Sequence, residues 1–353
     1  MNEQNSSQKQ RLIGPDIIRM VAIFCVIAGH FYTVNTPYNK TPFEGTSMFA
    51  QGWLKSMASC IGVPFFIMLT GFLNTRKTLS KDYYRGIKRV IIPYLIISII
   101  TWAVLSVDHS LKGLVLGILG FRAVGYAWYV EMYIGLFLLI PFLNMVLRQV
   151  FDNGQTKYLL LTALFLTALP PLLNRGDIHL VPGFWIMTFP VTFYIIAATI
   201  REYQPHLKRK VWWTFGAILL YGIAPVSRFA AMQLGGADFS MSASYYSIIN
   251  TAATVIVFLM LYDINEVPLW FKKTCTFVAS IAYEMFLWSY LFDKLAYPFF
   301  MERFYTSQPQ FIIWFVPIVV CVFLLSMTTA YIHKKLSDFW NYARQNYKNN
   351  HIR

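Results

Sequence analysis

The chain has 353 residues, of which 57% are hydrophobic, 18% aromatic and only 13% charged, with a mean hydropathy of +0.49. This composition excludes an ordinary soluble domain and indicates an integral membrane protein. The formal net charge of +14 would suggest a nucleic-acid partner in a soluble chain, so the positions of the basic residues must decide its meaning.

Long apolar runs dominate the chain, and they predict an all-α, polytopic membrane bundle. A helix needs about 20 residues to cross a hydrocarbon core of about 30 Å. About ten segments satisfy this requirement: 16–34, 55–74, 87–106, 126–147, 157–173, 183–201, 211–232, 243–262, 274–297 and 311–333. Segment 111–120 is too short to span and is expected to be interfacial or re-entrant. We therefore expect one transmembrane domain over 16–333, with short tails at 1–15 and 334–353.

Basic residues predict the orientation of this bundle. If the spans alternate from a cytoplasmic N-terminus, most of the 30 Lys and Arg residues fall on the cytoplasmic side. Because cytoplasmic loops are enriched in basic residues, both termini are expected in the cytoplasm of a multi-pass cell-membrane protein, and no nucleic-acid partner is implied. Only a minority lies on the outer side: Lys40, Lys55, Lys112, Arg122, Arg175, Arg228, Lys294 and Arg303.

The first predicted span contains a polar stripe formed by Asp16, Arg19 and His30. At about 100° and 1.5 Å per residue, Arg19 and His30 lie within roughly 20° of one face and roughly 16 Å apart along the axis. Asp16 returns to within about 40° of that face and can pair with Arg19. Such a stripe is costly against lipid, so it is expected to face a protein or water-filled interior.

Four sequence segments resemble the acyltransferase family 3 membrane proteins. Asp16 and Arg19, followed after ten residues by His30, match the signature of the family's first helix. The other segments are the paired-Phe segment 62–73, the basic run that precedes Pro93, and Trp128-Tyr129 followed by Gly135 and Pro141. The chain departs from the family at Ser289: many family members have a second histidine near this position. The resemblance therefore implies no role for a second histidine there.

The resemblance implies an enzyme that moves acyl groups, commonly acetyl from acetyl-CoA, onto hydroxyls of cell-surface glycans. An imidazole can accept a hydroxyl proton at physiological pH, and His30 is the best-placed candidate for a general base. By the resemblance, Arg19, with Asp16, organises the donor end, while Arg85, Lys88 and Arg89 hold the coenzyme A phosphates. Membrane topology alone would also produce a basic loop at 85–89. Trp128 and Glu131 are the expected substrate-binding residues. The four cysteines lack metal-ligand spacing, so no metal is expected.

Two other classes of protein remain open at this point. A transporter or flippase of a lipid-linked glycan or small solute would also combine buried charges with proline-broken helices. A non-catalytic scaffold of a polysaccharide export system is the third possibility, although it leaves the stripe from Asp16 to His30 unexplained. The carboxylates of Glu131 and Glu284 fit either a functional role or a structural ion pair.

Overall fold

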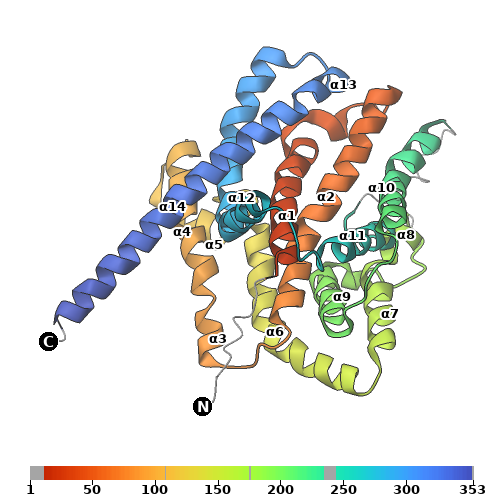
Figure 1. The fold of residues 1–353 in the computed structure, drawn as a ribbon. Coiled ribbons are helices and arrows are strands. Elements are labelled where there is room, and N and C mark those ends of the chain that lie inside the picture. Colours follow the sequence, from red (N-terminus) through yellow and green to blue (C-terminus); the bar gives the residue numbers. More distant parts are fainter. Residues whose placement is uncertain (1–11, 108, 175, 234–243, 352–353) are drawn as a thin grey trace.

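The computed structural model describes residues 12–107, 109–174, 176–233 and 244–351, and the described chain is a bundle of helices (Figure 1). The predicted all-α fold is confirmed. The helices that carry the argument below are α1 (Gly14–His30), α2 (Gly45–Asn74), α4 (Lys88–Leu105), α6 (Trp128–Asp152), α9 (Phe189–Tyr203), α10 (Lys210–Gln233), α12 (Leu269–Phe304) and α14 (Phe315–His351). The predicted ends of the tails, residues 1–11 and 352–353, lie outside the described residues.

Eight helices of the described chain are long and apolar enough to cross a membrane, fewer than the ten predicted. The predicted spans 157–173 and 243–262 correspond to shorter apolar helices, α7 (Thr156–Thr167) and α11 (Ile248–Leu261). A separate short helix, α8 (Pro170–Leu173), follows α7, because the rings of Pro170 and Pro171 favour a new helix start over continuation. Residue 243, where the eighth predicted span begins, lies outside the described residues.

Helix α1 occupies the centre of the bundle and packs against α2, α11, α12 and α14 (Figure 1). Its contact with α2 is close because Gly62 has no side chain. A Cβ atom at Gly62 would lie 2.7 Å from the Val26 side chain and 2.9 Å from the Val26 backbone nitrogen. Small residues at crossing points let membrane helices approach in this way.

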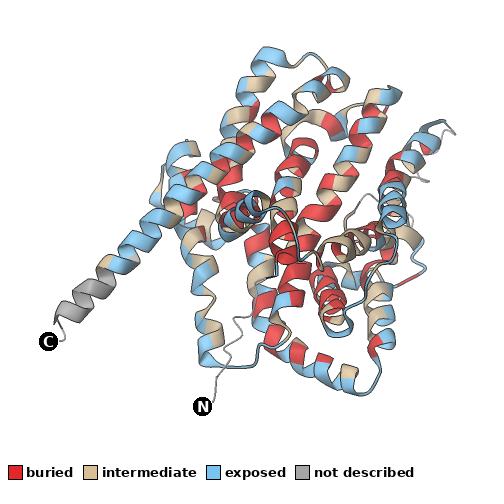
Figure 2. Ribbon diagram, viewed as in Figure 1, coloured by how far each residue is buried: buried red, intermediate tan, exposed pale blue. Residues whose placement is uncertain are grey.

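Burial is concentrated in α1, α2, α9 and α12, whereas α4, α6, α10 and α14 present apolar side chains outward (Figure 2). Ile92 and Ile99 of α4, Leu138 of α6 and Leu219 of α10 are examples of exposed aliphatic residues. Water would disfavour so much exposed apolar surface, whereas lipid accommodates it. The short helix α5 (Leu111–Leu119), predicted as too short to span, is likewise exposed and apolar.

Candidate active site

The N-terminal end of α1 carries the predicted Asp16–Arg19 pair. An Arg19 guanidinium nitrogen donates to Asp16 Oδ1 at 3.1 Å, and the hydroxyl of Thr276 in α12 donates to Asp16 Oδ2 at 3.1 Å. Asp16 is only 2% exposed, so these charge-assisted bonds replace the water that the carboxylate loses on burial. Together they fix the guanidinium of Arg19 at this end of α1.

At the other end of α1, His30 is held against a tyrosine and an aspartate. Its ring stacks on Tyr126 with the centroids 3.6 Å apart and the planes at 27°. His30 Nδ1 lies 3.6 Å from Asp293 Oδ2, and the His30 side chain is only 14% exposed. The contact with Asp293 is longer than a hydrogen bond, but it places a carboxylate where it would stabilise positive charge on the imidazole.

Asp293 is anchored independently of His30. The Tyr126 hydroxyl donates to Asp293 Oδ2 at 2.5 Å, and the Asn35 side-chain amide donates to the Tyr126 hydroxyl oxygen at 3.1 Å. Asp293 is fully buried, and its Oδ1 has no hydrogen-bond partner among the described residues. Asp293 was not among the residues predicted from the sequence. One signal pointed to it: this carboxylate lies within the predicted span 274–297, where an ionisable residue is a candidate for a functional role.

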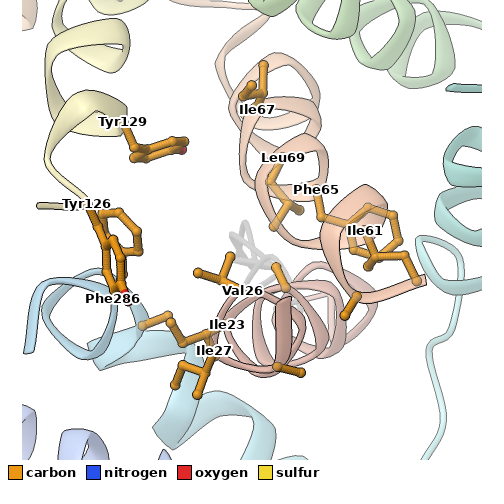
Figure 3. Packing of buried hydrophobic residues seen from close by; sticks show 14 of the residues in the cluster. Ile23, Val26, Ile27, Ile61, Phe65, Ile67, Leu69, Tyr126, Tyr129 and Phe286 are labelled. Carbon is orange, nitrogen blue, oxygen red and sulfur yellow. The ribbon is translucent and has the colours of Figure 1, made fainter. Parts of the chain in front are cut away.

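A cavity of about 280 Å³ lies between α1, α2, α4, α6 and α12. Arg19 and Arg89 are its basic lining residues. Its walls also include Val26, Leu69, Thr70, Tyr129, Tyr133, Tyr283 and Phe286. Figure 3 shows Tyr129 and Phe286 on one side, and Val26 and Leu69 on the other. The cavity therefore extends along α1 from Arg19 to Val26, which is one helical turn before His30.

Phe286 connects this cavity to the His30 cluster. Its ring centroid lies 5.4 Å from that of Tyr129, which lines the cavity, and 6.5 Å from that of Tyr126, which stacks on His30. The imidazole thus lies behind a wall of aromatic rings at one end of the cavity, while the two arginines lie at the other. Basic residues and an imidazole are therefore placed at opposite ends of the same cavity, with the aromatic rings between the cavity and His30.

The three basic residues expected to bind coenzyme A are not brought together at the cavity. Arg89 lines it, whereas neither Arg85 nor Lys88 does. Arg85 is 71% exposed and forms a 2.8 Å ion pair with Asp82, which is 87% exposed. Such surface pairs contribute little to stability, so this pair holds Arg85 only weakly.

Trp128 and Glu131, the expected substrate-binding residues, line a second cavity of about 830 Å³. It lies between α6, α9 and the segment 244–246, with Met187 and Tyr245 among its walls. Trp128 is 41% exposed. The structure therefore brings their neighbours Tyr126 and Tyr129, rather than Trp128 and Glu131, to the His30 cluster and the first cavity.

Fold and site together define a multi-pass helical membrane protein with a histidine, a tyrosine and a carboxylate clustered beside an internal cavity. The comparison with family models identifies the kind of protein. A model described as an acyltransferase domain matches residues 12–331, nearly the whole chain. The chain belongs to acyltransferase family 3 and is a membrane acyltransferase. Neither the comparison with curated proteins nor that with solved structures gave a match.

Proposed function

We propose that this acyltransferase moves an acyl group, in the simplest case acetyl, from cytoplasmic acyl-CoA to a hydroxyl of a cell-surface or lipid-linked glycan. The observation that carries the proposal is the placement of His30 beside Asp293, at the opposite end of α1 from Arg19. Family membership supports an enzyme over the transporter and scaffold alternatives.

In the proposed reaction, His30 accepts the proton of the acceptor hydroxyl as its oxygen attacks the thioester carbonyl. The carbon–sulfur bond then breaks, and the imidazolium returns the proton to the departing thiolate. Asp293 lies beside His30 Nδ1 and stabilises the imidazolium, while Tyr126 holds both groups through a stacked ring and a hydrogen bond. Atoms and charge balance without any further reactant.

The donor end of the proposal rests on Arg19 and Arg89. Guanidinium groups bind phosphate oxygens through two parallel hydrogen bonds, so the basic end of the cavity suits the nucleotide of acyl-CoA. Arg19 and His30 are roughly 16 Å apart along α1, a separation that an extended acyl-pantetheine arm would bridge. Reaching His30 then requires the thioester to pass the ring of Phe286.

The direct test measures transfer of labelled acetyl from acetyl-CoA in purified membranes. His30→Ala is expected to lose transfer by about 10²- to 10⁴-fold while inserting and accumulating normally. His333→Ala is the matched control, because it removes another half-buried imidazole, one that packs near Trp288 of α12 instead. Near-normal transfer by the His30 variant would remove this residue from the mechanism.

A further inference from the structure

Two basic side chains from distant parts of the chain meet over one tyrosine ring. Lys55 of α2 places its Nζ 5.0 Å from the centroid of the Tyr38 ring, and Arg228 of α10 places its Cζ 6.0 Å from the same centroid. Arg228 also lies 4.7 Å from the centroid of Phe43. Both basic side chains are half-buried. We refer to Lys55, Arg228 and Tyr38 as the basic cluster.

The basic cluster has no negative charge to balance it within the described part of the chain. Lys55 Nζ donates to the neutral side-chain oxygen of Asn39 at 2.7 Å. Neither Lys55 nor Arg228 forms an ion pair with a carboxylate of residues 12–107, 109–174, 176–233 or 244–351. Burial raises the pKa of Tyr38 to about 12, against the opposing influence of Arg228, so its phenol is neutral at physiological pH.

The ring beneath the two cations is firmly placed. Tyr38 is 1% exposed and Phe43 is 3% exposed. They approach α2 at Gly52, where a Cβ atom would lie 3.0 Å from both the Tyr38 hydroxyl and the Phe43 ring. Contacts with aromatic faces stabilise each cation without neutralising it. The two basic side chains are therefore held beside a buried ring, with no ion pair to a carboxylate in the part of the chain that the structure describes.

The basic cluster lies just beyond the His30 end of α1. Helices α1 and α2 run antiparallel, because Val26 packs against Gly62 while Gly29, next to His30, packs against Ser59. A Cβ atom at Gly29 would lie 3.4 Å from the Ser59 hydroxyl oxygen. Lys55 is four residues before Ser59, so it lies about 6 Å further along α2, past the end of α1. Asn39, the partner of Lys55, also donates to the Tyr32 carbonyl, two residues after His30.

We infer that the basic cluster binds an anionic group, a carboxylate or a phosphate, on the acceptor glycan whose hydroxyl is acylated at His30. An anion between Lys55 and Arg228 would relieve their mutual repulsion and gain charge-assisted hydrogen bonds from both. A neutral sugar offers neither gain. On the predicted topology, Lys55 and Arg228 are two of the few basic residues on the outer side of the membrane, where basic residues are depleted relative to the cytoplasmic side. The inference rests on the proposed function and adds the charge class of the acceptor.

The test compares three acceptors that differ at one carbon: methyl glucoside, methyl glucuronide and methyl glucoside 6-phosphate. Each is supplied with labelled acetyl-CoA to membranes containing wild-type protein. At least one charged acceptor is expected to exceed the neutral one in kcat/KM by about 10-fold or more, the range of one or two charge-assisted hydrogen bonds. The preferred charged acceptor distinguishes a carboxylate site from a phosphate site. Its KM should rise with salt, since half-exposed charges are screened.

The variants Lys55→Met and Arg228→Gln remove one charge each and keep most of the side-chain volume. Both are expected to lower the charged-to-neutral ratio of kcat/KM by about 10-fold. Arg303→Gln is the matched control: Arg303 is another predicted outer basic residue, over the Phe299 ring at 3.9 Å, and the ratio should not change. An equal preference for all three acceptors, or a ratio unaffected in both variants, overturns the inference while leaving the proposed function intact.

Absence of transfer to every acceptor would instead contradict the proposed function. In that case, equilibrium binding of radiolabelled methyl glucuronide and methyl glucoside 6-phosphate to purified protein decides whether the cluster binds anions. An anion site is supported if one of these two sugars binds, and if Lys55→Met weakens its binding about 10-fold while Arg303→Gln does not. The inference is overturned if neither sugar binds, or if Lys55→Met leaves the affinity unchanged. Accumulation and monodispersity of each purified variant show that it has folded.

Discussion

Replacing Asp293 with asparagine would remove the carboxylate charge beside His30 and keep its shape. The carbonyl oxygen of an asparagine can still accept the hydrogen bond from Tyr126, which anchors this position at 2.5 Å. The ring of His30 would stay stacked on Tyr126 at 3.6 Å. The substitution therefore tests the charge of Asp293 with little change in packing.

The magnitude follows from the 3.6 Å separation of His30 Nδ1 and Asp293 Oδ2. At an effective dielectric constant of about 20, full opposite charges at this distance attract by roughly 4.6 kcal/mol. The imidazole is only partly protonated in the transition state, so about half of this figure applies. About 2.3 kcal/mol corresponds to a decrease of roughly 50-fold in kcat. We expect a decrease between about 10-fold and about 10³-fold, with the KM for acetyl-CoA little changed.

The assay is acetyl transfer in membranes, with kcat and KM measured separately for each variant. Glu284→Gln is the matched control, because it makes the same chemical change on the same helix at a residue that lines neither cavity. Asp293→Glu retains the charge and is expected to recover part of the activity. If Asp293→Asn transfers acetyl within twofold of wild type while His30→Ala does not, Asp293 has no role in stabilising charge on His30.

Two further predictions concern the donor end and the topology. Arg89→Ala should raise the KM for acetyl-CoA by about 10-fold, and by more than Arg85→Ala does. The reason is that Arg89 lines the cavity, whereas Arg85 pairs with Asp82 at the surface. An equal rise of KM in both variants would place the phosphates outside the cavity. Reporter fusions after Ser80 and Lys208 should report inside and those after Asn39, Asp177 and Gln308 outside, and an inside report at Asp177 would show that the short helix α7 does not cross the membrane.

The helical bundle could be predicted because hydropathy and chain length are local properties. The predicted spans coincide with helices, and the pairing of Asp16 with Arg19 follows from a spacing of three residues on one helix. The number of full-length spans was less predictable. Span 157–173 contains enough apolar residues to cross, but a run of apolar residues does not reveal that Pro170 begins a separate helix.

Asp293 could not be paired with His30 from the sequence because their contact is created by the packing of α12 against α1. No spacing rule connects residues on different helices. Its neighbour Lys294 also makes the segment look like an ordinary charged helix end at the membrane boundary. The same applies to Tyr126, whose bond to Asp293 joins residues 167 positions apart.

The aromatic residues of α6 show why the family motif alone does not predict which residues line the first cavity. Tyr129 and Tyr133 are one turn apart and face the cavity that contains Arg19, whereas Trp128 and Glu131 face the second cavity. Both faces of α6 are thus lined by aromatic residues, and composition does not distinguish them. The position of α12 distinguishes the two faces of α6, because Phe286 packs against Tyr129 and Asp293 accepts a hydrogen bond from Tyr126. The sequence singles out His30, and the packing of α12 against α1 brings the carboxylate of Asp293 to it.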